Sequence, residues 1–142
     1  NELAAKRRKA RHYGVQALYK WHMIGGDPGE IVLEFCDEYD FINVDVEYFS
    51  NLLYSISSQV EDLEAVLLPI LDRELDELDP IERSVLRLGT FELKKRPDIP
   101  YKVVISESVA LAKKFGATDS HRYINGVLDK VARLLRSDEM VS

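Results

Sequence analysis

The chain has 142 residues, of which 46% are apolar and 31% are charged, and its formal net charge is −6. A chain of this length can bury a proper core, either as one domain or as two small lobes that share one core helix. The high charged fraction argues against a membrane protein. In addition, no apolar run reaches the roughly 18 residues of a membrane-spanning helix. The single cysteine, Cys36, excludes an internal disulfide and a cysteine zinc site, so we expect a protein of the reducing cytoplasm.

Charge is divided unevenly along the chain. Residues 1–11 carry five basic side chains and one acidic side chain, which gives +4. Residues 12–110 carry eight basic and twenty acidic side chains, which gives −12, and residues 111–142 return to +2 with six basic and four acidic ones. Basic ends around an acidic middle predict one anionic partner and one basic partner.

The first predicted helix covers residues 3–23. Its expected buried face follows the spacing of an amphipathic helix and consists of Ala10, Gly14, Ala17, Leu18 and Trp21. A second row on this helix contains Arg8, His12, Val15 and Tyr19. Basic side chains beside an exposed aromatic ring are typical of surfaces that bind phosphates and stack on bases. Five cations in six positions also oppose the helix dipole, which favours a nucleic-acid role over an ordinary solvated helix start.

The middle of the chain contains shorter elements. They are helices at about residues 30–36 and 44–57, a third helix that ends or bends at Pro69, and an acidic helical turn at residues 70–78. Cys36 is expected to be a small core residue, because no neighbouring histidine or basic cluster would activate its thiol.

The next helix, at residues 79–96, is expected to be the central one. Asp79 is a good N-cap, and apolar side chains spread over most of the helix circumference, as in a helix that is buried on several sides. Gly89 is expected to allow a close helix contact. Glu82 and Glu92 fall among the apolar residues, where a carboxylate must be paired or hydrogen-bonded. We interpret Glu92 as a core residue, and Glu82 as either a helix cap or a partner contact.

Two further helices complete the chain. One covers residues 101–115, and the other begins after a cap at Thr118 or Asp119 and runs to about residue 136, with Gly126 at an expected close helix contact. Nowhere between the turn signals do apolar and polar residues alternate as they do in a strand. The predicted fold class is therefore all-α with about seven helices, in a single domain covering residues 1–142 with a basic N-terminal segment at residues 1–11.

The sequence contains no recognisable catalytic or metal-binding motif. His12, His22 and His121 each lack a second ligand three or four residues away, and Ser120 and His121 diverge on a helix because they are neighbours in sequence. The acids of residues 72–79 scatter around their helical turn, which is more typical of a solvated or protein-binding face than of a metal site. We therefore expect a protein that is not an enzyme and has no cofactor.

Three segments carry a resemblance to a known family. They are KRRKARHYGVQALYKW at residues 6–21, IERSVLRLGTFEL at residues 81–93, and IPYKVVISESVALAKKFGATDSHRYINGVLDKV at residues 99–131. With these segments, nearly all of residues 4–136 resembles the NusB family of bacterial transcription antitermination factors. The resemblance implies two three-helix groups packed around a shared central helix.

The resemblance also implies partners. A NusB-like protein pairs with NusE, a ribosomal small-subunit protein, and the pair binds boxA RNA. The assembly joins an RNA polymerase antitermination complex that reads through terminators in ribosomal RNA operons. No membrane is involved, and the free protein is expected to be a monomer or a weak homodimer.

Site residues follow from the same resemblance. The RNA-binding set is Lys6, Arg7, Arg8, Lys9, Arg11, Tyr19, Asp119 and Tyr123, and the partner-binding set is Glu74 and Glu82. One departure is Ile70, which stands where some relatives have a tyrosine just after the proline, so the resemblance does not imply a stacking or hydrogen-bonding RNA contact there.

Two alternative functions are compatible with the sequence. NusB-like domains also occur at the N-terminus of ribosomal RNA cytosine methyltransferases, but this chain ends in the polar SDEMVS with no Gly-rich cofactor motif, which favours a stand-alone factor. The second alternative is a purely protein-binding helical adaptor whose basic start is merely solvated. A steep salt dependence of RNA binding would distinguish the RNA-binding function from the adaptor.

Overall fold

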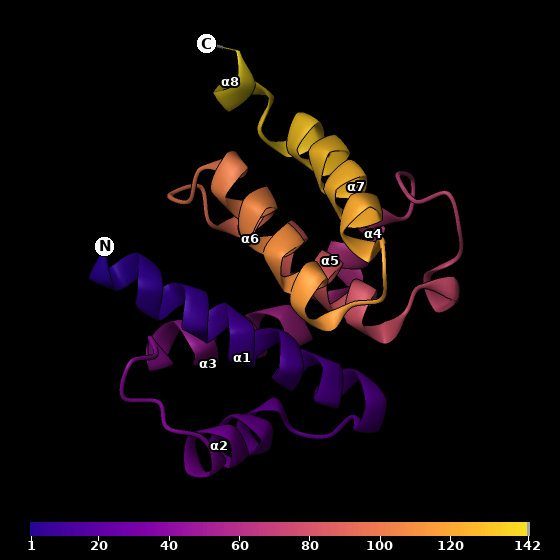
Figure 1. Ribbon diagram of the computed structural model, residues 1–142. Helices are drawn as coiled ribbons and strands as arrows, with labels where there is room; N and C mark the ends of the chain where they lie inside the picture. The colour runs from indigo at the N-terminus through magenta and orange to yellow at the C-terminus, as the bar shows by residue number, and fades with distance from the viewer. Residues whose placement is uncertain (142) are drawn as a thin grey trace. The chain divides into compact units, whose positions relative to one another are not determined.

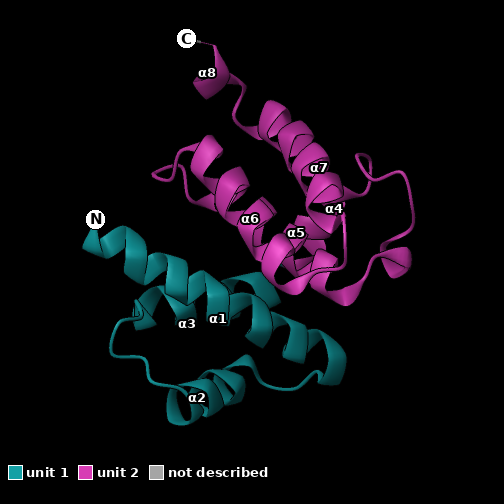
Figure 2. Ribbon diagram, in the orientation of Figure 1, with its two compact units in different colours: residues 1–59 teal, residues 60–142 magenta. Residues whose placement is uncertain are grey.

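The computed structural model describes residues 1–141, which contain eight α-helices, one short 3₁₀-helix and no strand. The predicted all-α class is therefore confirmed. The chain divides into two compact units, residues 1–59 and residues 60–142 (Figure 2). The single domain expected from the sequence stays a prediction. Among residues 1–141, no helix combines the length and apolar character that crossing a membrane requires.

The first unit is a three-helix group. Its helices are α1 (Glu2–Ile24), α2 (Pro28–Glu38) and α3 (Val46–Ser58) (Figure 1). Each begins after a residue whose side-chain oxygen accepts a hydrogen bond from a backbone N–H of the first turn, namely Asn1, Asp27 and Asp45. Such caps satisfy N–H groups that have no partner inside the helix.

The core of the first unit lies between α1 and α3. Leu18 of α1 and Phe49, Leu52 and Leu53 of α3 are completely buried. A Cβ added at Gly14 would lie 3.1 Å from Leu52 Cδ1, so the glycine gives that leucine its space. The predicted buried face of α1 is confirmed at residues 10, 14, 17 and 18, whereas the larger indole at residue 21 is only half-buried.

The second unit contains the remaining elements. They are α4 (Val60–Leu67), the 3₁₀-helix η1 (Leu75–Glu77), α5 (Pro80–Lys95), α6 (Tyr101–Phe115), α7 (Ser120–Leu135) and α8 (Ser137–Met140). Within this unit α5 packs against α4, α6 and α7, and every residue from 84 to 93 is buried. The prediction that this helix is buried on several sides is therefore confirmed.

Gly89 lies where α5 meets two neighbouring helices. A Cβ at this position would come within 2.8 Å of Leu128 Cδ1 on α7 and 3.0 Å of Ser108 Oγ on α6. The predicted close helix contact is therefore confirmed here. The same prediction for Gly126 is wrong, because nothing lies within 4 Å of a Cβ built there.

The C-terminal end of α5 is held by Arg136. Its guanidinium donates to the backbone carbonyl oxygens of Leu93 at 2.8 Å, Arg96 at 2.9 Å, Ile99 at 3.0 Å and Glu92 at 3.2 Å. The last carbonyl groups of a helix have no partner inside that helix. Arg136 therefore acts as a side-chain cap, although only 7% of its surface is exposed.

The predicted helical turn at residues 70–78 is mostly irregular. Only Leu75–Glu77 is helical, and it is a single 3₁₀ turn stabilised by a capping box in which the Glu74 N–H donates to Glu77 Oε1 at 2.8 Å. We call residues 68–79 the acidic loop. Because Pro69 and Pro80 restrict the chain at either end, the segment cannot continue α4 or start α5 early.

Candidate nucleic-acid and partner interface

Arg7, in the basic start of α1, is fixed against the body of its unit. The Arg7 guanidinium lies 5.0 Å from the centroid of the Tyr48 ring, and its Nε is 3.8 Å from Asp45 Oδ2. The backbone supports this contact, since the N–H of Asp45 donates to the carbonyl oxygen of Lys6 at 3.2 Å. Arg7 therefore joins α1 to the start of α3, whatever else it binds.

Arg11 lies one turn further along α1 and is buried, with 4% of its surface exposed. Its guanidinium is 5.6 Å from the Tyr48 ring centroid, on the same ring that Arg7 contacts. The buried face predicted for α1 did not include Arg11, so that prediction was incomplete. The physical reason is that a long arginine stem can cover apolar surface, so a charged residue need not mark a solvent-exposed helix face.

The remaining basic residues of the segment reach solvent more freely. Arg8 and Lys9 are exposed, and Lys6 is half-buried with its ammonium 3.5 Å from Glu2 Oε1. Tyr19 is exposed at 37% of its surface, as predicted for a ring that could stack on a base. Val15, which the sequence placed in the same row, is completely buried.

Glu82 joins the start of α5 to the start of α7. Its Oε1 accepts from the backbone N–H of Asp79 at 3.3 Å, and the Asp79 side chain in turn accepts from Ile81 N–H at 2.7 Å, within a capping box. The other oxygen of Glu82 accepts from Ser120 Oγ at 2.7 Å. Of the two roles considered for Glu82, the helix cap is therefore observed.

Asp119 occupies the N-cap position of α7 in a left-handed backbone conformation, with φ at 68°. Of the two residues predicted as the cap, Asp119 is the one at the N-cap position, but its side chain makes no capping hydrogen bond. The carboxylate instead lies 3.7 Å from Arg122 Nε, and both side chains are largely exposed. An exposed pair of this kind contributes little to stability and leaves the carboxylate accessible to a ligand.

Tyr123, one turn into α7, is in contact with the acidic loop. Its hydroxyl donates to Asp72 Oδ1 at 3.1 Å, and the Arg73 guanidinium lies 4.1 Å from its ring centroid. Burial and the hydrogen bond to Asp72 raise the pKa of the Tyr123 hydroxyl, while hydrogen bonds from Arg73 and Tyr123 lower the pKa of Asp72. Sequence reasoning missed Asp72 and Arg73, because nothing in the local pattern connects them to α7.

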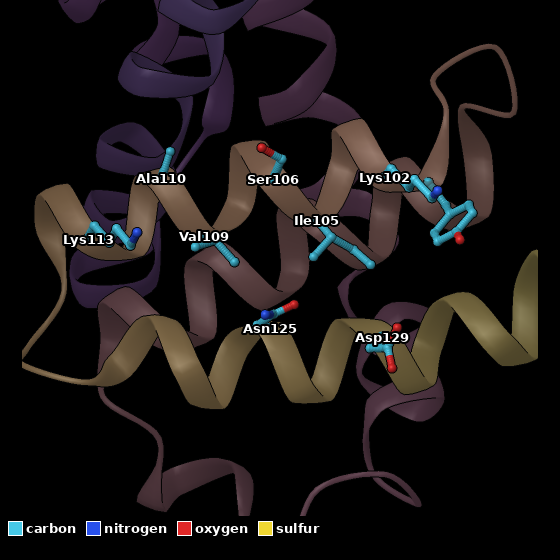
Figure 3. A pocket seen from close by; sticks show the side chains of 9 residues that line it. Lys102, Ile105, Ser106, Val109, Ala110, Lys113, Asn125 and Asp129 are labelled. Carbon is cyan, nitrogen blue, oxygen red and sulfur yellow. The ribbon is translucent and has the colours of Figure 1, made fainter.

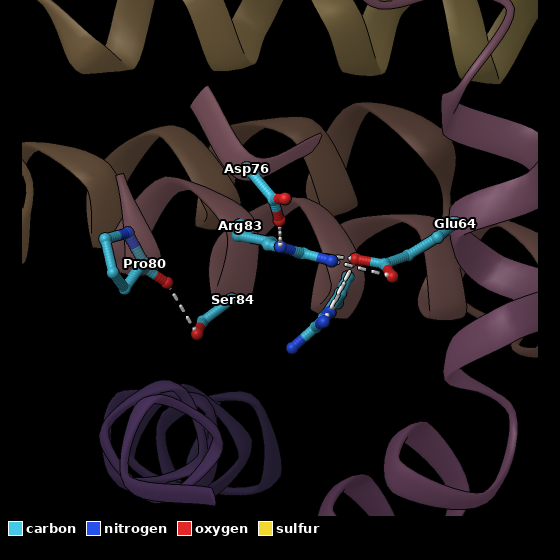
Figure 4. A network of polar contacts seen from close by, with 6 residues as sticks. Glu64, Asp76, Pro80, Arg83 and Ser84 are labelled. Carbon is cyan, nitrogen blue, oxygen red and sulfur yellow. Dashed lines mark hydrogen bonds and ion pairs between the residues drawn. The ribbon is translucent and has the colours of Figure 1, made fainter. Parts of the chain in front are cut away.

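The acidic loop is also attached to α5. Arg83 Nη1 donates to Asp76 Oδ1 at 3.3 Å, and the same guanidinium binds Glu64 of α4 (Figure 4). Glu74 is exposed between these attachment points, and Ile70 is half-buried. Glu74 and Glu82, the two residues predicted to bind a partner, thus belong to one unit, in which Glu74 lies on the loop and Glu82 begins α5.

A separate groove lies between α6 and α7, with a volume of about 560 Å³. Ile105 and Val109 of α6 and Asn125 and Asp129 of α7 are among its lining residues (Figure 3). None of the residues predicted to bind RNA or a partner lines it. Among residues 1–141, no group of three His, Cys, Asp or Glu side chains is placed to hold a metal ion.

Comparison with known proteins identifies the family. The NusB family profile matches residues 8–133. The chain belongs to the NusB family. The transcription antitermination protein NusB of Alcanivorax borkumensis is 52% identical over 133 residues, which cover 94% of this chain and 89% of the relative. NusB of Yersinia enterocolitica is 49% identical over 132 residues, covering 93% of this chain and 96% of the relative.

Solved NusB structures have the same fold. One structure of NusB from T. maritima superimposes with a TM-score of 0.81 at 31% identity, covering 89% of this chain and 90% of that one. A crystal structure of the antitermination factors NusB and NusE in complex with double-stranded RNA matches with a TM-score of 0.82 at 29% identity, covering 89% and 96%. The family match begins after Lys6 and Arg7 and ends before Arg136.

Proposed function

We propose that this NusB-family protein acts in transcription antitermination by binding boxA RNA together with NusE. The pair would then join the RNA polymerase antitermination complex on ribosomal RNA operons. The observation that carries this proposal is the likeness, over 93–94% of this chain, to proteins named transcription antitermination protein NusB. It is supported by the likeness to a NusB chain solved with NusE and RNA.

For RNA binding, the exposed residues of α1 are the strongest candidates. Arg8 and Lys9 offer cations to the phosphate backbone, and Tyr19 offers an aromatic face. Lys6, which is half-buried, is a further candidate. Arg7 and Arg11 are held against the Tyr48 ring, so we assign them a mixed role in which they stabilise the first unit and add positive potential.

For partner binding, the acidic loop and the start of α5 are the proposed surface. Glu74 and the exposed carboxylates near it create a negative potential that complements a basic protein such as a ribosomal subunit protein. Asp119 lies at the start of α7, next to Ser120, which donates to Glu82. In this proposal Asp119 lies near the RNA, so its charge tunes RNA affinity.

The antitermination function is preferred to that of a methyltransferase domain. The chain covers 82–96% of the length of the first curated relatives, and each of these carries the antitermination name. We further propose that the free protein is a monomer or a weak homodimer, which sedimentation at several protein concentrations would test.

The experiment is a titration of labelled boxA RNA with the protein, with and without equimolar NusE, and with a base-shuffled RNA as control. We expect measurable binding to boxA that falls steeply with salt, and tighter binding when NusE is present. Binding to NusE without any RNA affinity, alone or together, would instead support a protein-binding adaptor.

A further inference from the structure

The acidic loop is held at two points, and its proposed partner-binding residue lies between them. Toward its N-terminal end, Asp72 accepts from the Tyr123 hydroxyl at 3.1 Å and Arg73 covers the Tyr123 ring. Toward its C-terminal end, Asp76 accepts from Arg83 at 3.3 Å (Figure 4). Glu74 is therefore carried by a short segment whose two flanks are attached to α7 and to α5.

The surroundings of Tyr123 do not suit a base-stacking residue. One face of its ring is occupied by the Arg73 guanidinium, and its hydroxyl is engaged by a carboxylate. Arg73 itself pairs with Asp72 at 2.9 Å, so its charge is already largely compensated. A nucleotide stacking on that face would have to displace Arg73 and break a cation–π contact.

Electrostatics at this location favour a basic ligand over a phosphate. A hollow of about 400 Å³ on the loop is lined by Asp72, Arg73, Glu74 and Glu77, together with Leu68 and Leu71. Three carboxylates and one cation give the lining a net charge of −2, counted from these residues. An RNA phosphate would be repelled there, whereas a lysine or arginine of a partner would be attracted.

We infer that Tyr123 is a positioning residue of the partner-binding surface: through Asp72 and Arg73 it fixes the acidic loop for a basic protein partner, and it does not stack on RNA bases. The inference rests on the proposed function and reassigns one residue within it. The physical effect is preorganisation. A loop that is already ordered loses less conformational freedom on binding, so more of the contact energy remains as affinity.

The sharpest variant is Tyr123→Phe, which removes only the hydroxyl and keeps the ring, the charge and the helix propensity. We expect the dissociation constant for NusE to rise about three- to tenfold, the range for losing one ordinary hydrogen bond. RNA binding by the isolated protein and the melting temperature should remain as in the wild type. Tyr101→Phe, which removes a phenolic hydroxyl on α6, is the matched control and should change neither affinity.

A double-mutant cycle with Asp72→Ala tests the mechanism. Asp72→Ala and Tyr123→Phe remove the same hydrogen bond from its two ends, so their effects on NusE affinity should be clearly less than additive when combined. Additive effects would show that each residue contacts NusE separately and would overturn the positioning role.

Further outcomes would also overturn the inference. They are unchanged NusE affinity in Tyr123→Phe, a lower melting temperature without loss of NusE affinity, or a loss of RNA affinity in Tyr123→Leu while NusE binding is retained. These results are distinct from a failure of the proposed function, in which the wild-type protein itself would bind neither NusE nor boxA RNA.

Discussion

The Glu64 carboxylate on α4 accepts two hydrogen bonds from the Arg83 guanidinium on α5, at 2.7 Å from Nε and 3.1 Å from Nη2. Arg87, one turn further along α5, donates to the same carboxylate at 3.0 Å. Burial acts to raise the pKa of Glu64, but the hydrogen bond from Arg83 and the charge of Arg87 outweigh it and hold that pKa below its ordinary value. One carboxylate thus pairs with two nearly buried cations.

This arrangement predicts an acid-sensitive contribution to stability. The pKa of Glu64 is lower in the folded state than in the unfolded state, so the ionised carboxylate stabilises the fold. This contribution to the free energy of unfolding is complete at neutral pH and declines below the ordinary glutamate pKa of about 4.3. It is lost once the pH passes below the folded-state pKa of Glu64. Glu64→Gln should reduce the free energy of unfolding by about 1–3 kcal/mol at pH 7, and the difference from the wild type should shrink toward pH 3. Urea unfolding of the two proteins at several pH values measures the loss at pH 7 and its decrease toward pH 3. A pH-independent difference would contradict the linkage.

A second prediction concerns the cap of α5. Arg136→Met keeps the apolar stem but removes the donors to four carbonyl groups, so we expect a loss of about 2–4 kcal/mol in the free energy of unfolding. Arg133→Met is the control, since that side chain is 71% exposed and pairs only with Asp129 on its own helix among the contacts observed. Equal stability of the two variants would show that the carbonyl groups find water instead.

The regular part of the fold could be predicted from the sequence because local signals agreed. The helix expected at residues 101–115 is observed as Tyr101–Phe115, and that expected at residues 79–96 is observed as Pro80–Lys95. In both, apolar periodicity is combined with a boundary signal, such as Asp79 before the helix or Gly116 after it. The helical turn predicted at residues 70–78 was mostly wrong. Its pattern of apolar and charged residues is compatible with a helix, but Pro69 and Pro80 restrict the backbone at either end of the acidic loop.

Long-range contacts could not be predicted in the same way. Tyr123 and Asp72 are 51 residues apart, and Glu82 and Ser120 are 38 apart. Periodicity indicates which face of a helix is buried but not which element covers it. The burial of Arg11 was missed for a related reason, since residue type alone does not reveal that an aromatic ring from another helix lies beside its guanidinium.

The third prediction separates RNA binding from folding on α1. Replacing Arg8 and Lys9 together by glutamine should weaken binding to all RNAs and flatten the salt dependence by about 0.7 for each phosphate that the variant no longer binds. The melting temperature should not change, because both side chains are exposed. Arg11→Gln should instead lower stability by about 1–2 kcal/mol, since it leaves a buried site without its cation–π contact.

The prediction assigns RNA binding to Arg8 and Lys9 and folding stability to Arg11. An unchanged salt dependence of RNA binding in the Arg8 and Lys9 double variant would contradict it. A triple replacement of Arg7, Arg8 and Arg11 is a poorer experiment. Two of its three side chains lie over Tyr48, so weaker RNA binding could reflect a loosened first unit.

A fourth prediction tests whether Glu82 contributes charge to partner binding in addition to its capping role. Glu82→Gln keeps an acceptor oxygen for the Asp79 N–H but removes the charge, so stability should change by less than about 1 kcal/mol. Affinity for NusE should fall about three- to fivefold by the loss of one complementary charge, and Glu82→Lys should lower it further. Ser120→Ala, which removes the 2.7 Å hydrogen bond without a charge change, serves as control. Loss of stability without loss of NusE affinity would restrict Glu82 to its capping role.

The last prediction concerns the carboxylate of Asp119. Its backbone is left-handed, with φ at 68°, a conformation that asparagine adopts as readily as aspartate, and its side chain makes no capping bond that a substitution could remove. Asp119→Asn should therefore fold as the wild type does, at the cost of only an exposed ion pair with Arg122. If Asp119 lies beside the RNA, removing its charge removes a repulsion from the phosphates, and it also releases Arg122 to bind them.

RNA affinity of Asp119→Asn should accordingly rise about two- to fivefold at low salt and less at high salt, where exposed charges are screened within about 10 Å at 0.1 M. Measuring boxA affinity at two salt concentrations decides between this repulsion and the opposite role, in which the carboxylate accepts a hydrogen bond from a base edge. In the second case the asparagine variant would bind RNA less well at both salt concentrations. Arg122→Gln tests whether Arg122 is the cation that Asp119→Asn releases. If it is, Asp119→Asn should raise RNA affinity less in the Arg122→Gln background than in the wild type.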